Sequence, residues 1–236
     1  MEIRKVLLSV YQKIIELIFP ESKEAIFLKN ISNFDLFKIL NEYKKNYLFK
    51  EIYVKNKNYK IHSVFFYKNK LIKEMISQFK FKNKKNYADV FGFFMAEKIE
   101  NFFKNKNEID FYQEFILSFV PVHEKRKKER GFDQCELICD SIFKNIVKNG
   151  KLKVRYEKKL IEKKIYTQKQ SWKNKNDRQK NISGVFYLNK KFENKLIGQN
   201  IILIDDIVTT GYTAGEIIKI LDRENIKRIF IFTIAK

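Results

Sequence analysis

The stretch ILIDDIVTTGYT, residues 202–213, combines a buried strand, a polar turn and the start of a helix. Apolar residues 201–204 lead directly into two adjacent carboxylates, Asp205 and Asp206. The turn behind them carries threonines and a glycine, and a helical pattern follows. Unpaired N–H groups in the first turn of a helix point outward, and the helix macrodipole there favours an anion. The stretch therefore predicts a phosphate-binding turn at the end of a strand.

Each residue type in this stretch suits a different part of a sugar phosphate. Three threonine hydroxyls add donors to the turn, and glycine lets the backbone approach a ligand closely. Two carboxylates cannot hold a phosphate, but they suit the hydroxyl groups of a sugar or a divalent cation. A simpler interpretation remains, in which the acids only cap the next helix. The spacing excludes a standard P-loop, and no G-x-G-x-x-G dinucleotide motif is present.

Strands and helices alternate along most of the chain, which predicts an α/β fold. The strands have nearly continuous apolar cores, so we expect a parallel sheet covered by helices on both faces. We expect helices at 3–18, 70–80, 87–104, 133–148 and 213–224, with a short one near 173–180, and strands at 64–67, 115–122, 152–156, 185–188, 200–205 and 228–235.

A basic segment, HEKRKKERG at residues 123–131, directly follows the predicted strand 115–122. We expect this segment to be a loop, and one interpretation of its charges is that they merely form a solvated surface. Its position favours another interpretation, because the carboxyl ends of parallel strands meet at one edge of a sheet, where ligands bind. Cations at that edge would lie beside the acid pair and could bind a diphosphate. His123 could contact the ligand or make a structural hydrogen bond.

Composition limits the partners and the compartment. Lys and Arg number 49 and Asp and Glu 28, a net charge of +21 that favours polyanions. A lysine- and asparagine-rich composition is the competing explanation. The two cysteines, Cys135 and Cys139, are one helical turn apart and cannot build a four-thiolate zinc site or a disulfide framework. Neither a secretory signal nor a membrane-length apolar run is present, so we expect a cytoplasmic protein without membrane insertion.

The stretch 202–213 resembles the phosphoribosyl pyrophosphate (PRPP) motif of type I phosphoribosyltransferases. The resemblance implies that fold, with Asp205 and Asp206 on the ribose hydroxyls and on Mg²⁺, directly or through ribose or water. It also implies that the 5′-phosphate is held by Thr209, Thr210, Gly211, Tyr212 and Thr213. Tyr212 stands where small residues are frequent, a mild departure because the backbone N–H does the binding there.

A second block, PVHEKRKKERGFDQ at 121–134, is similar to the P-x-H-x-x-R-x-x-x-R-G-F-N-Q block of ComF-type proteins, with Asp133 in place of Asn. The segments TQKQSWKNKNDRQKNISGVF at 167–186 and IIELIFP at 14–20 resemble further blocks of that family. The resemblance implies ligand contacts for His123, Arg126, Arg130, Gln134 and Arg178. We expect the neighbouring cation Lys125 to help Arg126 bind pyrophosphate.

One departure from the ComF pattern concerns zinc. The family usually carries a four-cysteine zinc module after its opening segment, whereas ESKEAIFLKN at 21–30 has no cysteine. We therefore expect no zinc. We divide the chain into an N-terminal region, 1–60, which is a zinc-free and mostly helical counterpart of that module, and a phosphoribosyltransferase-like domain, 61–236.

Two functions follow from these resemblances. In the first, the protein binds PRPP or a nucleotide phosphate with Mg²⁺ and acts in DNA uptake, with transfer to a nucleobase as its enzymatic form and 163–183 as a loop that closes over the site. In the second, it is a competence factor that binds single-stranded DNA without turnover, with Phe132 and Trp172 as stacking candidates and a helicase-like partner. The acceptor base, the oligomeric state and the partner are not encoded in any motif.

Overall fold

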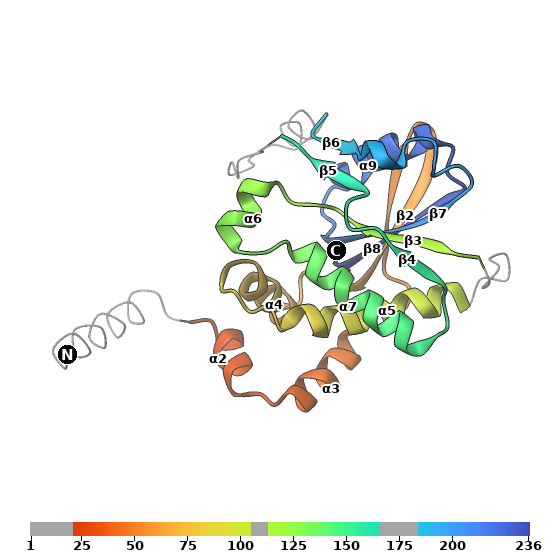
Figure 1. Cartoon of the computed structure of the whole chain (residues 1–236). Coiled ribbons are helices and arrows are strands. Elements are labelled where there is room, and N and C mark those ends of the chain that lie inside the picture. Colours follow the sequence, from red (N-terminus) through yellow and green to blue (C-terminus); the bar gives the residue numbers. More distant parts are fainter. Residues whose placement is uncertain (1–20, 105–112, 166–183) are drawn as a thin grey trace.

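A six-stranded sheet forms the centre of the molecule (Figure 1). The computed structural model describes residues 21–104, 113–165 and 184–236. The strand order is β1-β2-β8-β7-β3-β4, and every neighbouring pair is parallel except β1 with β2, which form an antiparallel hairpin. The strands of this sheet are β1 (Phe49–Val54), β2 (Lys57–Phe65), β3 (Phe115–Phe119), β4 (Val154–Tyr156), β7 (Asn200–Ile207) and β8 (Arg228–Ala235).

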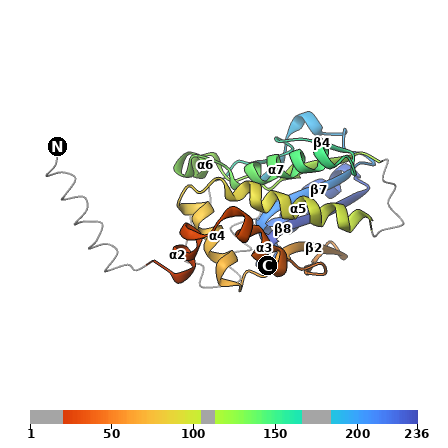
Figure 2. The same cartoon turned by 90° about the horizontal axis from the view of Figure 1, so that it is seen from below.

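Helices cover both faces of the sheet, as predicted. Figure 1 places α9 above the sheet and α4, α5 and α7 below it, and Figure 2 shows α5 and α7 side by side. The helices are α2 (Lys23–Asn30), α3 (Asn33–Tyr43), α4 (Lys70–Phe81), α5 (Tyr87–Lys104), α6 (Glu124–Arg130), α7 (Gln134–Asn149) and α9 (Tyr212–Leu221), with short 3-10 turns η1 (Lys190–Phe192) and η2 (Asp222–Glu224).

Strand β7 shows how one sequence serves two hydrophobic cores. Ile202 and Ile204 pack in the core shared with α4, α5 and α7, whereas Ile201 and Leu203 pack in the core shared with α9. All four side chains are fully buried. Successive strand residues point to opposite faces, so a strand buried on both sides must be apolar at every position. The continuous apolar run at 201–204 has this physical cause.

The order of the strands reverses between β3 and β7. From β3 the chain passes through α7 to β4 on one side, and from β7 it passes through α9 to β8 on the other. Right-handed crossovers in opposite directions place their helices on opposite faces of the sheet. The first helices therefore diverge and leave a crevice at the carboxyl ends of β3 and β7, where α/β proteins bind ligands. The predicted acid pair and basic segment both begin there.

Residues before the sheet form two capped helices. Ser22 and Ser32 accept hydrogen bonds from the backbone N–H groups of Ala25 and Asp35, which caps α2 and α3. Leu36 and Leu40 of α3 are buried in the core beside α4 and α5. The predicted domain boundary between residues 60 and 61 falls inside β2, so the hairpin from residue 49 onward is part of the main sheet.

One local prediction was wrong, and one predicted strand is present but lies in a separate small sheet. The basic segment after β3 is helical and forms α6, because lysine, arginine and glutamate are good helix formers and Gly131, at φ +79°, ends the helix. The predicted strand 185–188 does not join the main sheet. As β6 (Phe186–Leu188) it pairs antiparallel with β5 (Ile161–Lys163) in a separate two-stranded sheet.

Several sequence predictions concern segments that the structure does not describe. The predicted helix at 3–18, the short helix near 173–180 and most of the loop 163–183 lie outside the described residues, as do Arg178 and Trp172. Within the described ranges, no helix is long and apolar enough to cross a membrane.

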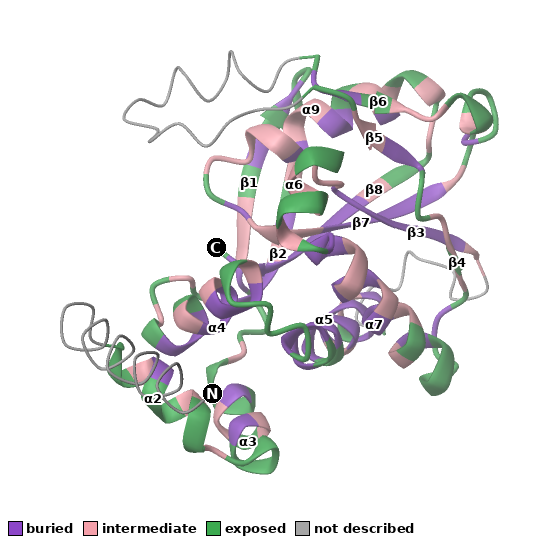
Figure 3. Ribbon diagram, turned by 60° about the vertical axis from the view of Figure 1, so that its left-hand side comes forward, coloured by how far each residue is buried: buried purple, intermediate pink, exposed green. Residues whose placement is uncertain are grey.

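The contact between α5 and α7 depends on a glycine. Figure 3 shows buried residues along the neighbouring sides of these helices. A Cβ atom at Gly92 of α5 would overlap the side chain of Ser141 on α7 and lie 3.2 Å from the carbonyl oxygen of Ile138. Glycine is therefore required for the close approach of the two helices.

We predict that Gly92→Ala lowers the free energy of unfolding by about 1–3 kcal/mol, because the helices must separate to admit the methyl group. Gly215→Ala in α9 is the matched control, since its Cβ would meet only Val54, at an ordinary 3.6 Å. There the higher helix propensity of alanine gives a neutral or stabilising effect of up to ~1 kcal/mol. Chemical denaturation of both variants measures the difference, and equal effects would contradict this account.

Candidate functional site

The turn between β7 and α9 has the geometry of an anion site. Gly211 is the N-cap of α9 with φ +87°, and no side chain caps this helix end. A Cβ at Gly211 would also overlap the side chain of Ile52, so both conformation and space require glycine. The turn residues 207–213 line a small pocket of about 30 Å³ together with Asp205. The N-terminus of α9 therefore has no side-chain cap, at the turn where the sequence predicts a bound phosphate.

The acid pair divides its contacts between two neighbours. The Asp205 carboxylate accepts a hydrogen bond from the backbone N–H of Asp206 at 2.8 Å, and the Cys135 thiol lies 3.8 Å from it. Asp206 forms an ion pair of 2.5 Å with Lys80 at the end of α4. Burial, and next the negative charge of Asp206, raise the pKa of Asp205 to about 7. Asp205 thus takes up a proton far more readily than an ordinary carboxyl group.

Helix α6 carries its arginines at the same edge of the sheet. Burial first, and then the charge of Arg126, lower the pKa of Arg130, while Asp206 opposes that shift. The Arg130 guanidinium stacks on Phe81 at 5.3 Å and donates a 2.6 Å hydrogen bond to Gln134. Arg130 therefore feels the positive charge of Arg126 and the negative charge of Asp206 together. The acid pair and the α6 arginines share one electrostatic environment.

A further cation, Lys163 of β5, completes this environment. Burial, and next the positive charge of Arg126, lower its pKa to about 8, while Asp205 acts in the opposite direction. Lys163 therefore links the acid pair to α6 from the small second sheet. Neither Lys163 nor Lys80 was predicted as a site residue, because both lie in segments without a motif. In the sequence each is only a lysine near the end of a helix or strand, and the fold brings both to this edge.

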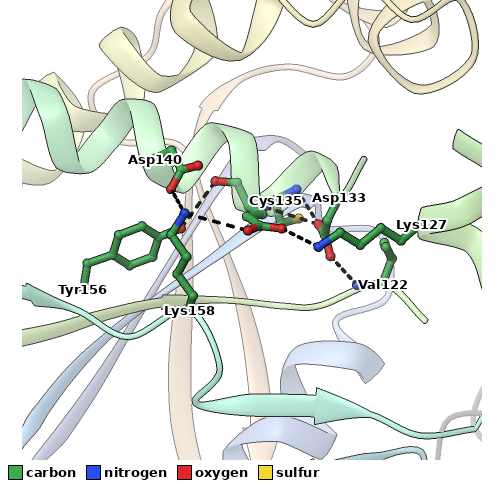
Figure 4. Close-up of polar contacts among 8 residues, drawn as sticks. Val122, Lys127, Asp133, Cys135, Asp140, Tyr156 and Lys158 are labelled. Carbon is green, nitrogen blue, oxygen red and sulfur yellow. Dashed lines mark hydrogen bonds and ion pairs between the residues drawn. The ribbon is translucent and has the colours of Figure 1, made fainter. Parts of the chain in front are cut away.

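Asp133 holds the basic segment in place. One carboxylate oxygen accepts hydrogen bonds from the N–H groups of Cys135 and Glu136, at 2.9 and 3.3 Å, and so caps α7. The other accepts from Val122 at 2.8 Å, before α6 begins (Figure 4). A single buried side chain thus joins the two ends of the segment that contains α6. The residue that differs from the ComF pattern has a clear structural role.

His123 also has a structural role. Its Nδ1 accepts a hydrogen bond from the N–H of Lys125 at 3.1 Å, which caps α6. The proton is then on Nε2, which lies 3.2 Å from the carbonyl oxygen of Lys164 next to β5. Of the two roles left open for His123, the structure provides the partners of the structural one.

The remaining predicted residues lie around the same edge in different environments. Lys125 is exposed, Arg126 is half-buried, and Thr209 is more exposed than the other turn residues. Gln134 is buried, and its side-chain amide nitrogen has no partner within the described chain. Lys127, by contrast, turns toward α7 and pairs with Glu136 at 2.8 Å, where Lys158 also binds Glu136 and Asp140 (Figure 4).

The donor set limits how a divalent cation can bind. Among the described residues, no group of three or more His, Cys, Asp or Glu side chains could hold a metal ion. Mg²⁺ commonly takes one or two carboxylates and completes its shell with water and substrate phosphates. The carboxylates of Asp205 and Asp206 fit that mode.

Comparison with known proteins places these features in context. No family model matches the chain. The competence protein ComFC of Bacillus subtilis is 30% identical over 151 residues, which are 64% of this chain and 53% of that protein. ComFC of Streptococcus pneumoniae is 24% identical over 74% of this chain and 68% of that protein. The DNA utilization protein YhgH of Escherichia coli K12 is 25% identical over 50% of this chain and 47% of that protein.

Solved structures overlap this chain only in part. Hypoxanthine phosphoribosyltransferase from Trypanosoma cruzi has a TM-score of 0.37 and 13% identity, over 63% of this chain and 67% of that one. The strand order and the helices on both faces of the sheet define the fold independently of this likeness. The chain spans about half the length of most of the relatives that it matches. The matched sequences carry competence and DNA utilization names throughout, and together they show that this chain is related to the ComF family.

Proposed function

We propose that the chain binds PRPP, or the phosphate of a nucleotide, with Mg²⁺ in the crevice between β3 and β7, and that it acts in DNA uptake. The observation that carries the proposal is the meeting of four features at one sheet edge. They are the uncapped N-terminus of α9, the acid pair, the α6 arginines and Lys163. The role in DNA uptake rests on the relationship to the ComF proteins.

Each part of PRPP has a chemical counterpart in this crevice. The 5′-phosphate fits the turn from Thr209 to Thr213, where backbone N–H groups and hydroxyls donate hydrogen bonds. The ribose hydroxyls can donate to Asp205 and Asp206. The pyrophosphate group fits Arg126, Arg130 and Lys163, since guanidinium groups bind phosphate oxygens in pairs. Gln134 and Arg178 match positions of the ComF pattern and Lys125 neighbours Arg126, which makes these three residues further candidates.

Lys80 stabilises the acid pair through an ion pair. Its ion pair with Asp206 holds that carboxylate in a fixed place and offsets the repulsion between two adjacent acids. Among the described residues Asp205 has no ion-pair partner, which fits its raised pKa. Bound Mg²⁺, held by the acid pair directly or through ribose or water, would supply positive charge beside the pyrophosphate.

In phosphoribosyl transfer, the bond between ribose C1 and the pyrophosphate oxygen breaks as the acceptor attacks C1. Negative charge gathers on the leaving group, and positive charge gathers on the ribose. Fixed cations near the first and carboxylates near the second stabilise both changes. Arg126, Arg130 and Lys163 would serve the leaving group, and Asp205 and Asp206 would orient the ribose. This assignment describes the enzymatic form of the proposal.

A binding protein without turnover is the second candidate. Both ring nitrogens of His123 are engaged in structural hydrogen bonds, which leaves this histidine unsuited to activating an acceptor. Release of pyrophosphate from PRPP with nucleobases present distinguishes the two forms. Release above the background rate supports the enzyme, and tight binding without release supports the binding protein.

We predict that Asp205→Asn/Asp206→Asn weakens binding of PRPP with Mg²⁺ by at least tenfold, because each charge-assisted hydrogen bond contributes about 1.5–3 kcal/mol. Titration calorimetry measures the change. Glu42→Gln/Glu193→Gln removes two exposed carboxylates elsewhere and controls for net charge. Unchanged affinity in the aspartate variant would exclude this site.

The raised pKa of Asp205 predicts a pH dependence of binding. With a pKa of about 7, the carboxylate is mostly ionised at pH 8 and mostly protonated at pH 6. We expect protonation of Asp205 to weaken the binding of PRPP with Mg²⁺ by about tenfold when the pH falls from 8 to 6. Asp205→Asn cannot titrate at this position, so any pH dependence of binding that remains in this variant comes from the ligand or from other groups. The same steepness in wild type and variant would assign the pH dependence to another group.

The same pKa shift affects stability in the absence of ligand. The folded protein binds the Asp205 proton more tightly than the unfolded chain, whose aspartates have pKa values of about 3.9. The contribution of Asp205 to the free energy of unfolding therefore falls as the pH rises from about 4 through 7. We expect Asp205→Asn to raise the unfolding temperature at pH 8 and to change it little at pH 5. Calorimetric scans at both pH values test this sign.

A further inference from the structure

A large groove lies at the opposite edge of the sheet from the proposed PRPP site. Its volume is about 1010 Å³, and the β1–β2 hairpin, the end of α5 and the start of β8 line it. We call it the hairpin groove. Arg228 of the groove pairs in register with Asn200, at the start of β7, whereas Asp205 pairs with Thr233. Five residues of β8 separate the two positions, or about 17 Å at ~3.3 Å per residue.

The hairpin groove is strongly basic. The cations in its lining are Lys57, Lys60, Lys98, Lys227 and Arg228. Asp222 is the one acidic residue among the described residues that line it, and Lys57 and Lys55 already bind it at 3.1 and 3.3 Å. The side chain of Arg228 has no hydrogen bond or ion pair within the described chain. Lys60 lies 3.8 Å from Glu51, whereas Lys227 and Arg228 have no ion pair within the described residues, so these two cations give the groove positive charge without a carboxylate partner.

Aromatic rings form the second component of the groove. Its rings belong to Tyr47, Phe49, Tyr59, His62, Phe102 and Phe230. The rings of His62 and Phe102 are 4.5 Å apart, and those of His62 and Phe49 are 6.2 Å apart, which gives a continuous aromatic wall. The ammonium group of Lys60 lies 4.7 Å from the centre of the Phe49 ring. Cations and ring faces therefore alternate along the same surface.

Tyr47 is the most exposed ring, at 90% of its full area. The loop that carries it is held by Lys98, which is buried and donates hydrogen bonds to the carbonyl oxygens of Lys45 and Asn46, at 2.7 and 2.5 Å. A buried ammonium group is a costly way to fix a loop. Its use here keeps the backbone beside an exposed aromatic ring in one position at the groove.

These features together indicate a class of ligand. An acidic peptide would use the cations but has few groups to stack on the rings. A nucleic-acid duplex would present phosphates but keep its bases paired. A single strand offers both a charged backbone and free base faces, and proteins bind it with basic grooves that carry stacking rings. The volume is at the upper end of the ~300–1000 Å³ of small-molecule sites, which leaves room for more than one nucleotide.

We propose that the hairpin groove binds single-stranded nucleic acid. Phosphates contact Lys60, Lys227 and Arg228, and bases stack on Tyr47 and Phe49. This site is separate from the proposed PRPP site, and the proposal stands whether or not PRPP binds. It also differs from the arrangement inferred from sequence, which placed the strand on the basic segment at the other sheet edge.

The test is fluorescence anisotropy with labelled dT12 and rU12, and with a 12-base-pair duplex, at two salt concentrations. Lys227→Gln/Arg228→Gln removes two phosphate contacts, so the slope of log affinity against log salt should fall by about 1.4. Tyr47→Ala should weaken binding of the single strands by roughly tenfold through lost stacking. Because Tyr47 and both cations are exposed, these variants should fold normally, which circular dichroism confirms.

Lys70→Gln/Lys73→Gln on α4 is the control, since it removes the same charge from exposed positions beyond the carboxyl end of β2, at the other end of the strand from the groove. The proposal is supported if binding is lost in the groove variants and kept in the control. The affinities for dT12 and rU12 then show whether DNA or RNA is preferred. Equal losses in the control, no binding of either strand, or equal affinity for the duplex would overturn it. Loss only in Asp205→Asn/Asp206→Asn would also overturn it. Binding of PRPP by the groove variants is measured in parallel, so failure of one site is not mistaken for failure of the other.

Discussion

The reversal of strand order between β3 and β7 is the constraint on which the site depends. Two right-handed crossovers leave this point in opposite directions and carry α7 and α9 to opposite faces of the sheet. Each face then has its own hydrophobic core, and the strands between them must be apolar at every buried position. The crevice between the diverging segments receives whatever residues follow β3 and β7. In this chain those residues are the cations that follow β3 and the carboxylates in the last residues of β7.

Within that crevice, charges of both signs are held close together and partly buried. Asp206 is paired with Lys80, whereas Asp205 is left with a raised pKa beside it. Burial lowers the pKa values of Arg130 and Lys163, which disfavours their charged forms. Groups in this condition gain from a ligand that brings the missing opposite charge. A sugar diphosphate with a divalent cation supplies both signs, which is why the geometry favours such a ligand over a simple anion.

The cations of the chain fall into three groups with different surroundings. Part of it lies at the crevice, part binds carboxylates on α7 such as Glu136 and Asp140, and part lines the hairpin groove. The crevice combines cations with carboxylates, whereas the hairpin groove combines them with aromatic rings. These two combinations suit different parts of nucleic-acid chemistry. A sugar phosphate fits the first, and a strand with free bases fits the second.

The sequence by itself determined the α/β class, the turn at 209–213 and the edge where acids and cations meet, because apolar periodicity and strand-end motifs are local signals. The basic segment was predicted as a loop, although its Lys, Arg and Glu residues and the following Gly131 are local signals that favour a short helix. Lys80, Lys163 and the hairpin groove were decided by the tertiary structure alone. Their members lie far apart in the chain, and only packing of α4, the second sheet and the hairpin against the central strands brings them together. A motif records neighbours in sequence, whereas the fields that shift the pKa values of Asp205 and Lys163 depend on neighbours in space.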